Sequence, residues 1–90
     1  MTTWYRRHPD LRLTALEGEG VVLQLGSRRY FTVNEVGVDI LEALREPRTL
    51  DQLVSEIMHH YAVGEERAAK SVRNFLERCA GTALVLAEER

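Results

Sequence analysis

The side chains on predicted helices that could do chemistry on their own are the imidazoles of His59 and His60 and the thiol of Cys79. Imidazole is a common metal ligand and general base, and a thiolate is a strong nucleophile. The two histidines are adjacent, so on a helix they point about 100° apart and do not face one metal ion. Cys79 falls on the apolar stripe of a predicted helix, which is typical of a buried, inert thiol. With no Gly-rich phosphate loop or nucleophile motif either, we expect no enzyme, no metal site and no cofactor.

Length and composition indicate one small globular domain. The 90 residues are 44% apolar, no apolar run approaches the length of a membrane span, and no signal peptide is recognisable. A single cysteine excludes an internal disulfide and suits a reducing compartment, so we expect a cytoplasmic protein without membrane contact. The net charge of −2 disfavours a general nucleic-acid binder.

The strands that would position a binding site are predicted in the first half of the chain. Residues 21–34 read as two strands joined by a turn at 26–28, and the alternation of apolar and polar residues at 11–15 predicts a strand before them. Three successive strands with short turns favour an antiparallel meander. Residues 1–10 are expected to form a flexible arm, and residues 11–90 a single domain.

Three helices are predicted to follow the strands. Asn34 can cap the first, Thr49–Gln52 is a capping box that begins the second, and the third begins after Gly64 and ends near Gly81. Each carries an apolar stripe at helical spacing. Residues 82–86 predict either a short strand or a segment folded back on the core. Strands followed by helices indicate an α+β fold.

The run from Gly26 to Leu41 resembles the central signature of the PqqD-like family, in which an aromatic strand runs into Asn, then a Gly three residues on, then an apolar helix. The segment from Thr49 to Leu76 is also similar, and the resemblance covers residues 11–86. It implies a winged-helix-like fold, a three-stranded antiparallel meander followed by three helices.

The same resemblance implies recognition of a peptide. Such domains, called RiPP recognition elements, bind the leader segment of a ribosomally made precursor peptide and present it to a processing enzyme. Residues 30–37 and the short form are similar to the stand-alone proteins of lasso-peptide biosynthesis, which implies delivery to a leader peptidase. The alternative is a pyrroloquinoline quinone-type chaperone for a radical SAM enzyme. That branch often has Pro-Glu in the turn where this chain has Gly26-Ser27. The chain also departs from the family pattern at two apolar positions, since Leu41 stands where many relatives have Trp and Val33 where many have Leu.

A leader could add as a fourth strand at the edge of the third strand, beside the third helix. Backbone pairing would give affinity, and pockets between the two elements would give selectivity. Tyr30 and Phe31 point to opposite faces, so only one of them faces the groove, and the sequence leaves open which. The expected peptide-binding residues are Arg28, Arg29, Tyr30, Phe31, Thr32 and Val33 on the strand and Ala69, Val72, Arg73, Leu76 and Ala80 on the helix.

Two other functions remain open from the sequence. A DNA-binding winged helix would use the third helix for recognition, with Arg67, Lys70, Arg73 and Arg78 as the contacts. Three glutamates on that helix and the acidic net charge oppose this, because phosphate contact dominates affinity for DNA. An interaction domain would instead pair its open strand with another protein or with a second copy of itself.

Overall fold

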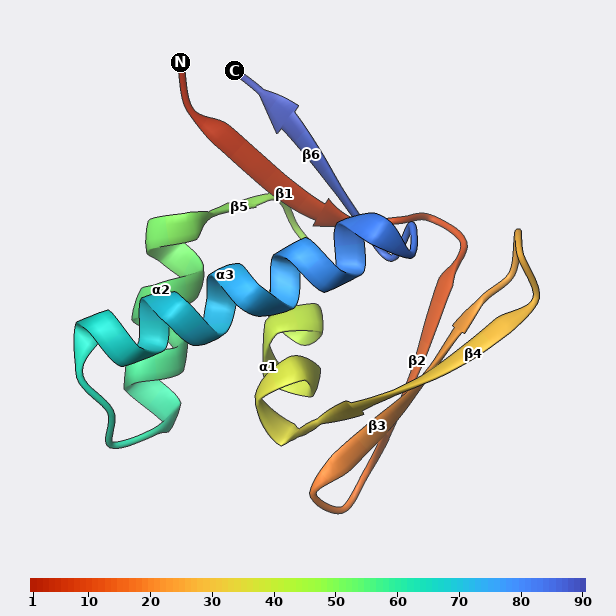
Figure 1. Ribbon diagram of the computed structural model, residues 1–90, viewed down its shortest axis with the longest axis horizontal. Helices are drawn as coiled ribbons and strands as arrows, with labels where there is room; N and C mark the ends of the chain where they lie inside the picture. The colour runs from red at the N-terminus through yellow and green to blue at the C-terminus, as the bar shows by residue number, and fades with distance from the viewer.

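The three predicted strands form an antiparallel meander in the computed structural model, which describes residues 1–90 (Figure 1). They are β2 (Leu11–Leu16), β3 (Glu19–Gln24) and β4 (Arg29–Asn34), paired in the order β2-β3-β4. The tight turn between β2 and β3 places Gly18 at a φ of 75°, a conformation that glycine adopts without steric cost. On β3 the buried face carries Val22 and Gln24.

The three predicted helices are present, and the α+β class is confirmed. They are α1 (Glu35–Ala43), α2 (Leu50–His60) and α3 (Glu65–Gly81). The Asn34 side chain accepts a hydrogen bond from the Gly37 N–H at 2.9 Å, as expected for the cap of α1. The capping box of α2 is also confirmed, because Thr49 and Gln52 bond each other's backbone N–H reciprocally. The likeness to a winged helix stays a prediction.

The expectation of a flexible arm at residues 1–10 is wrong in this structure. A second antiparallel sheet has the order β5-β1-β6, made of β1 (Thr3–Arg7), β5 (Arg48–Thr49) and β6 (Val85–Glu89). The two chain ends lie side by side, and Thr2 and Arg90 exchange backbone hydrogen bonds of 2.8 and 2.9 Å (Figure 1). The partner of β1 lies at the far end of the sequence, so no local pattern identifies the pairing. Of the two alternatives for residues 82–86, the strand is present, displaced to Val85–Glu89.

The second sheet also supplies hydrogen-bond donors to the carboxyl end of α1. This helix has no basic residue in its own last turn. Arg7 from β1 donates to the Leu41 carbonyl at 3.3 Å, and Arg48 from β5 donates to the Ala43 carbonyl at 3.2 Å. These two guanidinium groups satisfy carbonyls that a helix end leaves without partners. The amino-terminal strand is therefore part of the fold.

The hydrophobic core lies where α1, α2 and α3 meet the inner faces of the strands. α3 passes between the two sheets, with β1 and β6 on one side and the meander on the other (Figure 1). The largest fully buried side chains are Leu11, Val22, Ile40, Leu41, Leu44, Leu53 and Val72. None of the helices has both the length and the apolar character needed to cross a membrane.

Gly37 allows α1, α3 and β4 to approach one another. A Cβ at this position would lie 2.7 Å from Cε1 of Phe75 and 3.0 Å from Cβ of Val33. A Cβ has no rotamer by which to escape, so one of the neighbouring elements would have to move. Gly37, in the first turn of α1, is therefore required by packing.

We expect Gly37→Ala to lower the free energy of unfolding by about 1–3 kcal/mol, because overpacking outweighs the better helix propensity of alanine. The matched control is Gly81→Ala at the end of α3, where an added Cβ meets nothing within 4 Å. That substitution should be neutral or stabilising by up to about 1 kcal/mol. Urea denaturation of both variants provides the measurement, and equal effects of the two substitutions would contradict the packing argument.

Candidate functional site

The outer edge of β4 has no strand beside it. β4 pairs only with β3, in a register that matches Phe31 with Val22 and Val33 with Gly20. The carboxyl-terminal strand β6, which could have covered this edge, pairs with β1 instead. In an edge strand alternate residues direct their N–H and C=O groups away from the sheet. Those groups are available to an added strand.

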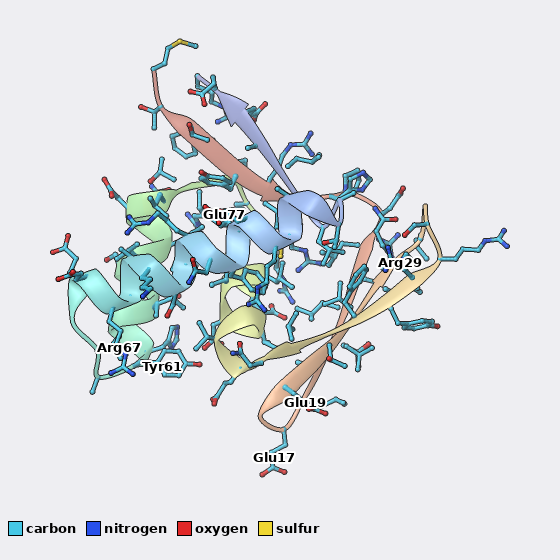
Figure 2. All side chains as sticks on the ribbon, viewed as in Figure 1. Glu17, Glu19, Arg29, Tyr61, Arg67 and Glu77 are labelled. Atoms are coloured by element: carbon cyan, nitrogen blue, oxygen red, sulfur yellow. The ribbon has the colours of Figure 1, made fainter.

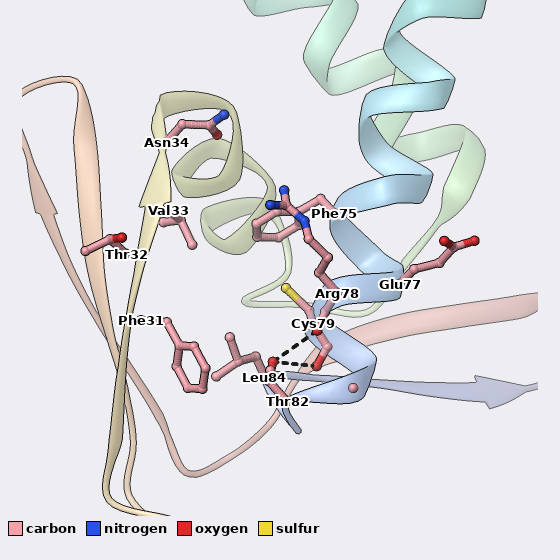
Figure 3. Close-up of a pocket in the computed structure, with 11 residues that line it drawn as sticks. Phe31, Thr32, Val33, Asn34, Phe75, Glu77, Arg78, Cys79, Thr82 and Leu84 are labelled. Atoms are coloured by element: carbon pink, nitrogen blue, oxygen red, sulfur yellow. Dashed lines mark hydrogen bonds between the residues drawn. The ribbon is translucent and has the colours of Figure 1, made fainter.

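A groove of about 610 Å³ runs between this edge and α3 (Figure 3). The backbone of β4 approaches β3 and α1 closely and has no comparable approach to α3. The groove is lined by Phe31, Thr32, Val33, Asn34, Phe75, Glu77, Arg78, Cys79, Gly81, Thr82 and Leu84. An unpaired strand edge and a side-chain groove therefore lie next to each other.

The inner walls of the groove are apolar. Figure 3 shows Phe31 and Val33 extending from β4 toward α3, and Phe75 and Cys79 extending from α3 toward β4, with Leu84 between them. In the same view Thr32 points to the other side of β4, and Glu77 points away from it. Apolar walls of this kind favour apolar side chains of an incoming segment.

Two guanidinium groups lie against the aromatic rings of the walls. The Cζ atom of Arg29 is 5.3 Å from the centroid of the Phe31 ring, and that of Arg78 is 5.9 Å from the centroid of the Phe75 ring. Neither arginine has a carboxylate within 4.0 Å. One wall of the groove is thus edged by Arg29 and the other by Arg78, both able to pair with an acidic group.

Gln24 shapes one end of the groove. It is the only buried polar side chain, 3% exposed, and its Nε2 donates to the Ala83 carbonyl at 3.1 Å. Its Oε1 accepts from the N–H of Gly26 at 2.5 Å and of Ser27 at 3.2 Å. One amide therefore ties the β3–β4 turn to the loop that places Leu84 in the groove.

The site carries no group suited to covalent catalysis. Burial raises the pKa of the Cys79 thiol to about 11, so the thiol is protonated at neutral pH. No cluster of three or more His, Cys, Asp or Glu side chains is arranged to hold a metal ion. His60 lies at the exposed end of α2, where its Nε2 is 3.1 Å from Oε1 of Glu56.

The structure decides between the two aromatic residues of β4. Phe31 lines the groove, whereas Tyr30 is 71% exposed and does not line it. Of the other expected strand residues, Thr32 and Val33 contribute to the groove, and Arg29 lies over the Phe31 ring. Arg28 occupies the turn before β4, at a φ of 58°.

The expected helix residues do not line the groove. Val72 and Leu76 are buried in the core, and Ala69 packs against it. Arg73 is exposed elsewhere on α3. Ala80 is also exposed and lines a neighbouring cavity of about 480 Å³ that includes Arg29 and shares Gly81 and Thr82 with the groove.

The groove instead follows the opposite edge of the apolar stripe of α3, where Phe75, Arg78 and Thr82 lie. A helical wheel gives two polar edges to such a stripe and does not say which one faces the sheet. The sequence placed Cys79 only on the apolar stripe of the helix and Arg78 only among the DNA contacts, and it did not single out Phe75. Their position on the apolar stripe was the only indication in the sequence. It predicts that these residues face the protein interior, but it does not say which edge of the stripe faces β4.

Comparison with known proteins identifies relatives of this architecture. The family described as coenzyme PQQ synthesis protein D (PqqD) matches residues 19–85. No curated protein matches the chain significantly. Among solved structures, the chain is similar to TbiB1 in complex with the TbiA(β) leader peptide. The two share 25% sequence identity and a TM-score of 0.79, over 89% of this chain and 93% of that one.

A second similar structure is lasso peptide synthetase B1 complexed with the leader peptide. It is 16% identical, with a TM-score of 0.76, over 91% of this chain and 96% of that one. The likeness to it concerns the fold. The family match spans β3, β4, all three helices and the start of β6, which includes every element that lines the groove. The resemblance deduced from the Gly26–Leu41 run is confirmed, and the chain belongs to the PqqD family.

Proposed function

We propose that this protein is a RiPP recognition element that binds the leader segment of a precursor peptide and presents it to a processing enzyme. The observation that carries the proposal is the unpaired edge of β4 beside an apolar groove of about 610 Å³. Support also comes from the two similar structures, each of a protein complexed with a leader peptide. The residues at 30–37, and Gly26-Ser27 in place of Pro-Glu, favour the lasso-peptide pathway, with a leader peptidase as the receiving enzyme, over the pyrroloquinoline quinone pathway.

In the proposed complex the leader adds to β4 as a fourth strand of the meander. The outward N–H and C=O groups of β4 would pair with those of the leader, which gives affinity without dependence on side chains. Selectivity would come from the groove, since alternate side chains of an added strand point toward one face. This arrangement requires no movement of the three existing strands.

Burial of apolar leader side chains against the walls of the groove would supply free energy of binding. Each apolar leader side chain that becomes buried contributes about 1.5–3 kcal/mol. Two or three such side chains, less the cost of ordering the peptide, correspond to a dissociation constant on the order of micromolar. Arg29 and Arg78 would pair with leader carboxylates near the rings of Phe31 and Phe75. Pairs at an exposed rim contribute only about 0–1 kcal/mol each and act mainly on register.

A role in binding and not in catalysis agrees with the chemistry of the groove. Cys79, the only cysteine, is 3% exposed, and its pKa of about 11 keeps it protonated at neutral pH. Below that pKa the thiol acts as a small apolar surface beside Phe75. The chemical step would belong to the enzyme that receives the leader.

The first prediction concerns the ligand. A synthetic leader segment of the precursor encoded nearby should bind with a dissociation constant on the order of micromolar, and the core segment of the same precursor should bind at least about tenfold more weakly. Isothermal titration calorimetry with both peptides provides the measurement. Equal heats from the two peptides would exclude leader recognition, and tight, salt-sensitive binding of duplex DNA with no leader binding would support the winged-helix regulator instead.

The second prediction separates the two aromatic residues of β4. Phe31→Ala should weaken leader binding about tenfold or more, because the ring forms a wall of the groove. Tyr30→Ala is the matched control on the adjacent residue and should change affinity less than about threefold, because its ring lies outside the groove. Circular dichroism should verify that both variants are folded. A larger effect of the Tyr30 variant would place the leader on the other face of the meander.

The third prediction tests strand addition through the backbone of the leader. N-methylation removes one amide donor at a time, so leaders methylated at successive positions should lose affinity with a period of two residues. Affected positions should lose about fivefold or more, and the positions between them should change little. A loss that is uniform along the leader, or that repeats every three or four residues, would be inconsistent with an added strand.

A further inference from the structure

Four arginines converge on a cleft that shares no residue with the groove. The cleft has a volume of about 310 Å³ and lies where the end of β1, the start of β2 and the loop after α1 meet. Arg6, Arg7, Arg12 and Arg45 line it, together with Pro9 and Pro47, and we call it the arginine cleft. A chain with a net charge of −2 thus gathers a third of its twelve basic residues around one cleft.

Carboxylates of the chain neutralise little of this charge. Glu42 pairs with Arg45 at 2.7 Å, and it is the only carboxylate within 4.0 Å of any of the four guanidinium groups. Neither Arg6, Arg7 nor Arg12 has an acidic partner. The positively charged guanidinium groups repel one another, and an anion bound among them would reduce this repulsion.

Two of the guanidinium groups are held in place by the backbone. Arg7 donates through Nη1 to the Leu41 carbonyl at 3.3 Å, and Arg12 donates through Nη1 to the carbonyls of Pro9 and Leu11 at 2.9 and 3.0 Å. Each keeps further N–H donors free, because a guanidinium has five. Desolvation lowers the pKa of Arg7, and so do the positive charges of Arg45 and Arg12, although Glu42 opposes them. Arginine stays protonated nonetheless, so the cleft presents oriented cations.

We propose that the arginine cleft binds an acidic segment of a second protein, one that carries adjacent Asp or Glu side chains. Forked guanidinium groups match the geometry of carboxylates, and His8, two prolines and two leucines form the rest of the wall. The volume accommodates a few side chains. A nucleic acid would need an extended basic face, whereas the rest of this chain carries the acidic excess and would repel a polyanion. The cleft leaves the groove free, so both sites can be occupied together.

A rhodamine-labelled peptide with four consecutive glutamates provides a probe that does not depend on the leader. Fluorescence anisotropy at about 50 mM salt should give saturable binding. The double variant R6Q/R12Q should weaken it about tenfold or more. The matched control R67Q/K70Q removes the same charge from exposed positions of α3, where Figure 2 labels Arg67, and should change affinity less than about twofold.

Amide chemical shifts in the unmodified protein supply a readout that needs no variant. Addition of the same peptide should shift the amide signals of the non-proline residues in 6–12 and 44–47, with or without leader in the groove. Equal weakening by the two double variants, or shifts confined to β4 and α3, would overturn the proposal. So would absence of saturable binding, or tighter cleft-dependent binding of a DNA duplex. None of these results bears on whether the leader binds, so the two proposals fail separately.

Discussion

The binding architecture depends on one choice of strand partner. β6 hydrogen-bonds to β1 along its whole length, so the carboxyl-terminal segment is unavailable to the open edge of β4. An open edge normally favours association with other chains. Here a basic residue lies at the start of the edge strand, and another occupies the turn before it. Positive charge at an edge discourages pairing with a second copy. The edge can therefore remain open for a ligand while the protein stays folded.

The same residues serve the fold and the groove, which links stability to binding. Asn34 ends β4, caps α1 and lines the groove. Gly37 lets Phe75 lie against α1, and this contact helps to fix the position of the Phe75 ring in the wall. Gln24 is buried in the meander, yet it holds the loop that carries Leu84. The groove is thus bordered by a helix cap, a close helix contact and a buried amide that the fold itself uses.

The two proposed sites differ in their chemistry and share no residue. The groove has apolar walls and a free backbone edge, which suit an extended peptide. The arginine cleft is built from other elements and gathers four guanidinium groups. A protein that carries one polypeptide to another needs two surfaces that do not compete. Their different chemistry would keep the two ligands from exchanging places, because specificity is a difference between affinities.

The sequence by itself determined the meander, the three helices and both helix caps, since these depend on alternation, helical spacing and capping residues that lie close together in the chain. It also identified the family and the strand that has an open edge. Only the tertiary structure decided three things: that residues 3–7 pair with 85–89, that Phe31 and not Tyr30 lines the groove, and that α3 presents Phe75 and Arg78 there instead of Leu76 and Ala80. The reason is the same in each case. A strand has two faces and an apolar helix stripe has two edges, and the choice between them depends on contacts with residues distant in the sequence.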